Sequence, residues 1–219
     1  MSAGAGAGLP PKAARYVMLV LAAGGLLAAG SLVAVVLQPR PSLAALAMGA
    51  AAGAAAFVLQ RRGFVFHWGG QRTTSTLDEP TLFFALLVLP PPHAILCVLG
   101  GIVVAQVVAR RKPIKGAYNA SAYALSAGVG ALAYRAVLGA GADPLAAGAA
   151  AVVGYAVTSN VLISFLFARL ESASALRILR ERFARTLLVN AMFGYALVVA
   201  LVALWRLHPA APLALAPLV

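Results

Sequence analysis

Three polar residues lie where a membrane protein could use them to hold a ligand: Asp78, Glu79 and Asn119. The two acidic residues come directly before Pro80 and an apolar segment, and the asparagine lies just inside another apolar segment. A carboxylate beside a broken intramembrane helix can bind a cation, a proton or a polar ligand. The same residues also suit simpler roles, because acidic residues and proline are typical of helix starts and an asparagine can bond to a neighbouring helix. Both interpretations stay open.

Two clusters of basic residues could contact anionic lipid or a partner protein. The first separates two apolar segments, and the second accompanies Leu176, Leu179 and Phe183, which recur at helical spacing. Lys and Arg between spans are typical of cytoplasmic anchors, and the same charges can bind lipid headgroups or a phosphate-bearing ligand. The first cluster comprises Arg110, Arg111, Lys112 and Lys115, and the second comprises Arg177, Arg180, Arg182 and Arg185.

The sequence contains no recognisable catalytic constellation. His93 and His208 adjoin prolines, and neither has a second histidine or a carboxylate at metal-ligand spacing. No histidine with a carboxylate orients a serine or threonine, and Walker and dinucleotide-binding motifs are absent from the sequence. The single cysteine, Cys97, allows no disulfide framework. We therefore expect no catalytic residue, no metal site, no cofactor and no enzymatic activity.

The composition indicates the class of protein in which these residues lie. Of 219 residues, 63% are hydrophobic and only 10% are charged, whereas soluble domains carry about 25% charged residues. The net charge of +12 could suggest a nucleic-acid partner, but the basic residues fall between apolar runs, so we exclude nucleic acid. The sequence predicts an all-α fold, a polytopic transmembrane bundle in one membrane domain that covers residues 17–219, after a tail of residues 1–16.

Five apolar segments are long enough to span a bilayer, which takes about 20 residues. The first two are rich in small residues that let helices approach closely, and we expect packing there at Gly24, Ala28, Gly49 and Gly53. The predicted spans are residues 17–37, 43–60, 118–138, 145–168 and 186–205.

A further apolar stretch, residues 81–109, is interrupted by Pro90, Pro91 and Pro92. Three consecutive prolines break a helix, which leaves one broken crossing or a helical hairpin of residues 81–89 and 93–109. A single crossing would put Arg110 on the opposite side from Arg61, in conflict with the rule that positive loops stay inside. The charge pattern therefore favours the hairpin.

The remaining segments complete the expected topology. Residues 63–80 form a polar connection with interfacial aromatic residues, and residues 169–185 form an amphipathic helix in the cytoplasmic interface. Residues 210–219 open a further, incomplete helix. Because the inner loops then collect most of the basic residues, we expect a multi-pass protein of the cell membrane with a cytoplasmic N-terminus.

An ordered set of motifs runs from Thr76 to Leu138, about a third of the chain. It resembles the multi-pass sensory membrane domain that precedes GGDEF, EAL or HD-type output domains in bacterial, actinobacterial-type cyclic-di-GMP signalling proteins. The resemblance implies a ligand-responsive membrane domain in a bacterial inner membrane, although this sequence contains no output domain. The motifs are Glu79-Pro80, the proline break at residues 90–92, Gly100-Gly101, Arg110-Arg111, and Lys115 with Asn119.

Three functions remain open at this point. The first is a sensory or ligand-binding membrane domain that passes a signal to a cytoplasmic partner or output domain. The second is a small-molecule transporter, or the substrate-binding subunit of a transport complex, with a ligand beside Asp78, Glu79 and Asn119. The third is a structural subunit of a membrane complex.

Overall fold

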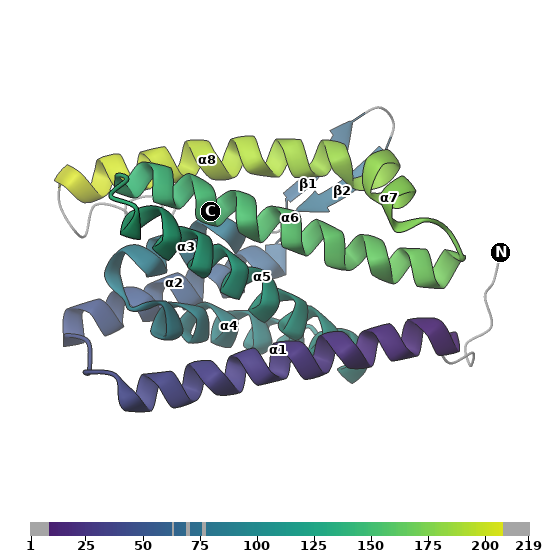
Figure 1. Ribbon diagram of the computed structural model, residues 1–219, viewed down its shortest axis with the longest axis horizontal. Coiled ribbons are helices and arrows are strands. Elements are labelled where there is room, and N and C mark those ends of the chain that lie inside the picture. The colour runs from purple at the N-terminus through teal and green to yellow at the C-terminus, as the bar shows by residue number, and fades with distance from the viewer. Residues whose placement is uncertain (1–8, 63, 69–70, 76–77, 208–219) are drawn as a thin grey trace.

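The computed structural model describes residues 9–62, 64–68, 71–75 and 78–207, which form a helical bundle with one short β-hairpin (Figure 1). The all-α bundle predicted from the sequence is confirmed. Residues 210–219, expected to open a further helix, lie outside the described residues. The elements are α1 (Pro11–Leu37), α2 (Leu43–Arg62), β1 (Phe64–Trp68), β2 (Gln71–Ser75), α3 (Asp78–Val88), α4 (Pro91–Val108), α5 (Pro113–Gly139), α6 (Pro144–Glu171), α7 (Ala175–Ile178), η1 (Leu179–Phe183) and α8 (Ala184–Leu207).

Four of the described helices are long and apolar enough to cross a membrane. This supports a multi-pass membrane protein. Helix α5 has 27 residues, or about 40 Å, which is also sufficient length. It buries polar side chains such as Tyr123 and Ser126 inside the bundle, so its composition is less apolar than that of its neighbours. The four helices are Pro11–Leu37, Leu43–Arg61, Pro91–Val108 and Pro144–Glu171.

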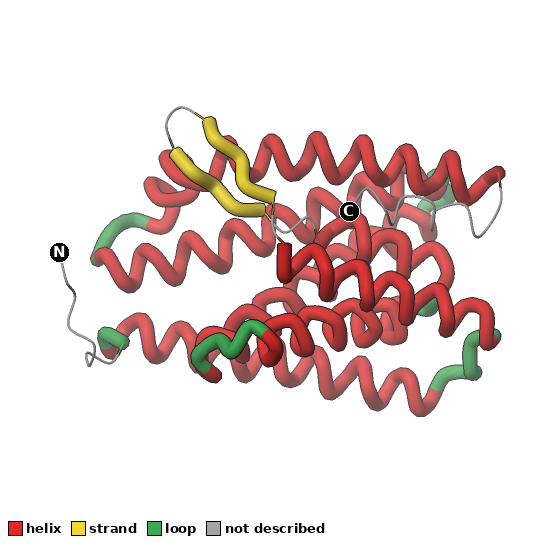
Figure 2. The backbone as a smooth tube through the Cα atoms, turned by 180° about the vertical axis from the view of Figure 1, so that it is seen from behind, coloured by secondary structure: helices red, strands yellow, loops and turns green. Residues whose placement is uncertain are grey.

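The segment predicted as a polar connection contains an antiparallel β-hairpin, in which Phe64 pairs with Ser75 and Trp68 pairs with Gln71. Figure 2 shows its two strands beside the helices. The sequence carried a signal for it, since aromatic, β-branched and threonine residues flank Gly69-Gly70, a dipeptide typical of hairpin turns. The aromatic residues, predicted as interfacial anchors, thus belong to a strand.

Helices α2 and α4 run parallel, and this settles the geometry of the proline-broken segment. Gly49 of α2 lies against Cys97 of α4, and further along both helices Gly53 lies against Gly101. Since α4 runs in the direction of α2, α3 between them must run back. The segment is therefore a helical hairpin, as the charge pattern predicted, with α3 ending at Val88 and α4 beginning at Pro91.

The prolines also reduce the number of unpaired backbone N–H groups at the starts of the helices. The first backbone N–H groups of a helix have no partner within it, and leaving them unpaired in an apolar setting is costly. Pro91 and Pro92 have no N–H, and Ala94 donates to the Pro90 carbonyl. Helices α1, α5 and α6 likewise begin with proline in the first turn. Proline at these positions removes donors that would otherwise need partners.

Helix α3 forms the centre of the bundle. Its 11 residues span about 16 Å, roughly half of a bilayer core. Every residue from Pro80 to Leu86 is buried, and Phe83 is completely inaccessible. Helices α2, α4, α6 and α8 all pack against α3. This cover lets a helix of about half the membrane thickness lie within a membrane, because its residues from Pro80 to Leu86 are enclosed by protein and not by lipid.

Small residues bring the other helices close together. The backbone of Ser121 in α5 lies directly beside Gly24 in α1, and the Ala151 carbonyl of α6 would lie 2.9 Å from a Cβ atom at Gly130. The predicted packing roles of Gly24, Gly49 and Gly53 are thus confirmed, and Ala28 is half-buried. Packing of this kind can hold helices together in lipid, where the hydrophobic effect contributes little between them.

Gly101→Val should separate α2 from α4, because a side chain at Gly101 would collide with the backbone of Gly53. We expect a loss of about 1–3 kcal/mol in the free energy of unfolding, as for other overpacked sites. The measurement is the thermal unfolding midpoint of the purified protein in detergent. Gly100→Val is the matched control, since nothing lies within 4 Å of a Cβ atom at Gly100. Equal midpoints for the two variants would contradict the packing argument.

Candidate functional site at the basic end of the bundle

One end of the bundle gathers most of the positive charge, and we call it the basic end. It comprises the starts of α1 and α5, the ends of α2, α4 and α6, and the α7–η1 segment. Among the described side chains, Arg40 and Arg206 lie at the opposite end and Arg135 lies near it. The described basic side chains of the basic end are Lys12, Arg15, Arg61, Arg110, Arg111, Lys112, Lys115, Arg169, Arg177, Arg180 and Arg182.

The described acidic side chains do little to neutralise this end. Glu171 forms a bidentate ion pair with Arg182 at 2.6 and 2.8 Å, and Glu181 pairs with Arg177 at 2.9 Å. Asp143 belongs to the other end, where its carboxylate accepts hydrogen bonds from the backbone N–H groups that start α6. The basic end therefore keeps a large excess of positive charge, which attracts anionic surfaces.

Beneath the first basic cluster, three side-chain amides form a chain across three helices. Asn119 Nδ2 of α5 donates to Gln106 Oε1 of α4 at 3.3 Å. Gln106 Nε2 in turn donates to Gln60 Oε1 of α2 at 3.2 Å. Gln106 is buried, so these bonds form away from water and satisfy groups that would otherwise be costly to bury. The amide chain fixes the register of α2, α4 and α5 at the basic end.

Two tyrosines join the remaining helices at this end. Tyr16 of α1 and Tyr118 of α5 both donate from their hydroxyl groups to the carbonyl oxygen of Leu162 in α6, at 2.8 and 3.1 Å. The Tyr16 ring also stacks on Phe165, with the ring centroids 6.2 Å apart. Three helices are thus joined at a single backbone carbonyl.

The second basic cluster lies in a segment that the structure divides differently from the predicted helix of residues 169–185. Helix α6 continues to Glu171, and a left-handed residue, Ser172 (φ 53°), reverses the chain. Helix α7 then continues through the π-helix η1 into α8. The reversal escaped sequence analysis because Ser172 carries no strong turn signal of the glycine or proline kind.

Side-chain contacts attach this segment to the end of α6. Besides its ion pair with Glu171, Arg182 lies over the ring of Phe167, 5.8 Å from the centroid. Phe167 also packs against Phe183. The hydrogen bond and the charge of Glu171 raise the pKa of Arg182 above its ordinary value, so that the guanidinium stays charged. Arg177 and Arg180 remain exposed on the outer face.

The structure brings only part of the predicted ligand site together. Asn119 bonds to a neighbouring helix, as one of the two interpretations proposed, and it lies beside the first basic cluster. Asp78 and Glu79 begin α3, but their side chains lie outside the described residues, as does the side chain of Arg185. Whether Asp78 and Glu79 contact a ligand stays a prediction.

Sequence analysis missed four residues that organise the basic end: Tyr16, Gln60, Gln106 and Tyr118. Gln106 had a usable signal, because it is the one amide between His93 and Ala109 in an otherwise apolar run. Polar residues in such runs commonly mark interhelical contacts. The partners could not be inferred, since they depend on which helices are neighbours.

Comparison of the chain with protein-family models, with curated proteins and with solved structures finds no match. The similarity to sensory domains of cyclic-di-GMP signalling proteins is therefore untested. Function has to be argued from the residues of the basic end and from the helices that position them.

Gln106→Leu should cut the amide chain at its centre and leave Asn119 without its partner on α4. We expect a loss of about 1–2 kcal/mol in the free energy of unfolding, the upper part of the range measured for interhelical hydrogen bonds in membranes. A double-mutant cycle with Asn119→Leu should show coupling between the two positions. Asn160→Leu is the control, because Asn160 donates to Ala156 within its own helix. Strictly additive effects of Gln106→Leu and Asn119→Leu would contradict the hydrogen bond between these two side chains.

Proposed function

We propose that this chain is a sensory domain of the cytoplasmic membrane, which binds a small molecule or lipid and passes its state to a cytoplasmic partner through the outer face of α7 and η1. The observation that carries the proposal is the attachment of this segment. It is held to α6 by Arg182, and it continues without a break into α8.

A mechanical route connects the centre of the bundle with that face. Helix α8 packs against the buried helix α3 and against α6. Gly194 of α8 lies so close to Val152 of α6 that an added Cβ atom would come within 2.9 Å of it. Close-packed helices slide or rotate as units more readily than they deform. A shift of the α3–α4 hairpin on ligand binding would therefore move α8 and the segment that precedes it.

The outer face offers a partner both charge and apolar surface. Arg177 and Arg180 are exposed, and Leu176, which directly precedes Arg177, is 72% exposed. The π-helix η1 adds an irregular turn of a kind that occurs frequently at functional sites. A partner with an acidic surface and an apolar pocket would complement this face.

Neutralising the outer face should release the partner. For the double variant Arg177→Gln/Arg180→Gln, we expect severalfold lower recovery of the cross-linked partner from native membranes, because the complementary charge is lost. Arg40→Gln/Arg206→Gln removes the same charge from the opposite end and serves as the control. Unchanged recovery with the first variant would count against the proposal, and the absence of any cross-linked partner would count more heavily.

The orientation of the bundle can be tested separately. If the basic end faces the cytoplasm, a cysteine at Ser174 should react with a membrane-impermeant thiol reagent only after cell lysis, whereas one at Ala140 should react on intact cells. Both positions are exposed, one at each end of the bundle. The background is Cys97→Ser, and labelling of both variants in detergent is the control. The opposite pattern of labelling would reverse the topology.

Transport is the competing function, and the observation that favours it is the proline-broken α3–α4 hairpin, in which α3 is short and buried. Transporters hold their substrates beside broken helices near the middle of the membrane. A transporter would be stabilised thermally by its substrate, and Glu79→Gln at the start of α3 would weaken that stabilisation. A screen of small molecules that finds stabilisation of this kind, together with no cytoplasmic partner, would favour transport over sensing.

A further inference from the structure

The seam between the start of α1 and the end of α6 combines three cations with an aromatic and apolar surface. Helix α1 runs parallel to α5, since Gly24 lies beside Ser121 and Leu27 lies beside Gly128. Helix α6 runs antiparallel to α5, because Tyr118 bonds to Leu162 whereas Gly130 lies beside Ala151. Helices α1 and α6 are therefore antiparallel, and at this end Tyr16 both stacks on Phe165 and donates to the Leu162 carbonyl.

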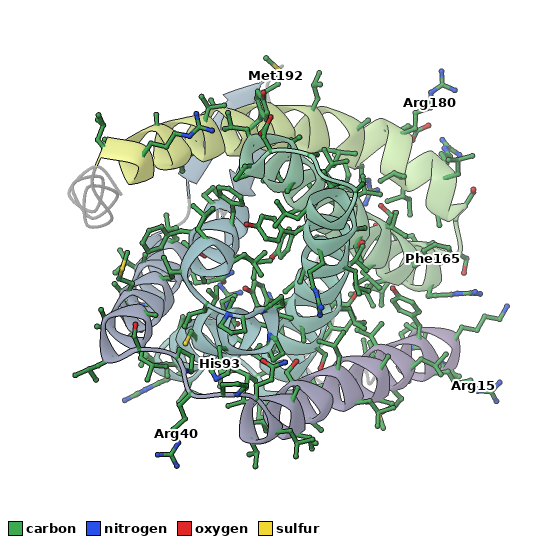
Figure 3. The ribbon with its side chains drawn as sticks, turned by 60° about the vertical axis from the view of Figure 1, so that its left-hand side comes forward. Arg15, Arg40, His93, Phe165, Arg180 and Met192 are labelled. Carbon is green, nitrogen blue, oxygen red and sulfur yellow. The ribbon has the colours of Figure 1, made fainter. Side chains whose placement is uncertain are left out.

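Helical periodicity places charges directly above this stack. Lys12 precedes Tyr16 by four residues and Arg169 follows Phe165 by four, so each lies one turn further out on the same face of its helix. Arg15 lies on the adjoining face, and Figure 3 shows Arg15 and Phe165 on the same side of the bundle. All three cations are exposed, and none forms an ion pair or side-chain hydrogen bond within the described part of the chain.

Below the charges the seam becomes apolar. Phe165 is 42% exposed, and Leu19, nearly one turn deeper on α1 than Tyr16, is 69% exposed. The rise from Lys12 to Tyr16 is about 6 Å, close to the depth of one headgroup layer. The order of cations, aromatic ring and aliphatic surface thus follows the order of phosphate, interface and acyl chain in one leaflet.

From this arrangement we propose that the α1–α6 seam binds an anionic phospholipid. The headgroup phosphate pairs with Lys12, Arg15 and Arg169, and an acyl chain lies along Leu19 and Phe165. Charge complementarity favours this occupant, because an anionic headgroup would pair with three cations that have no anionic partner in the described part of the chain. The site differs from the basic cluster at Arg110–Lys115, which lies on the turn between α4 and α5 and in the first turn of α5. It requires only that the bundle lie in a membrane, and it stands or falls independently of signalling.

The test uses the full chain, delipidated in detergent and titrated with phosphatidylglycerol or phosphatidylcholine while bound lipid is counted by native mass spectrometry. The variant Lys12→Gln/Arg15→Gln/Arg169→Gln should bind phosphatidylglycerol about a hundredfold more weakly than the parent protein. Each lost charge lowers the affinity about fivefold, and the three effects multiply. The control variant Arg110→Gln/Arg111→Gln/Lys115→Gln removes the same charge from the same end and should retain the affinity. Leu19→Ala/Phe165→Ala should weaken binding while every charge remains.

Three results would overturn the proposal. If both charge-neutralised triple variants bind phosphatidylglycerol equally weakly, the lipid is attracted by the whole basic end and not by the seam. Displacement of the lipid by millimolar inorganic phosphate would identify a soluble anion as the ligand. If the triple variant does not fold, the single variants Arg15→Gln and Arg169→Gln decide the matter, and parental affinity in both would exclude the site.

Discussion

The close approach of α2 and α4 at Gly53 and Gly101 is the constraint on which the rest of the structure depends. Two helices can meet backbone to backbone only where side chains are absent, so the glycines set how closely α2 and α4 approach, and the successive contacts of Gly49 with Cys97 and of Gly53 with Gly101 show that the helices are parallel. That alignment sends α3 back through the bundle and brings the ends of α2 and α4 to the same side. Gln60 then lies beside Gln106, and Arg61 lies at the same end as Arg110. The hairpin and the hydrogen bond from Gln106 to Gln60 both depend on this contact.

Polar groups inside the bundle are placed where they can join helices. The amide chain from Gln60 to Asn119 and the two tyrosines on the Leu162 carbonyl are all at the basic end. The opposite end relies on backbone geometry, with prolines that start α4 and α6 and the Asp143 cap. At that end His93 is buried, and its Nδ1 atom has no hydrogen-bond partner among the described residues. The two ends thus differ in how their helices are held, as well as in charge.

The position of α3 explains how a change within the bundle could reach its surface. A helix of about half the membrane thickness, surrounded by α2, α4, α6 and α8, cannot move without displacing at least one of them. Helix α8 leads directly to η1 and α7, and Figure 3 shows Arg180 of η1 pointing away from the bundle. The lipid seam on the other side of α6 involves α1 and α6 only. Lipid binding and signalling would therefore act on different surfaces of the same bundle.

The sequence by itself determined the class of protein, the proline-broken hairpin and the packing roles of Gly24, Gly49 and Gly53, because composition, proline chemistry and residue size act locally. It also indicated that most basic residues share one side of the membrane. They fall in the loops between apolar spans, and positively charged loops stay on the inner side. Only the tertiary structure decided that Asn119 bonds to Gln106, that Tyr16 and Phe165 form one seam, and that α7 continues into α8. These depend on which helices are neighbours and on their register, and the periodicity of a single apolar helix carries no information about either.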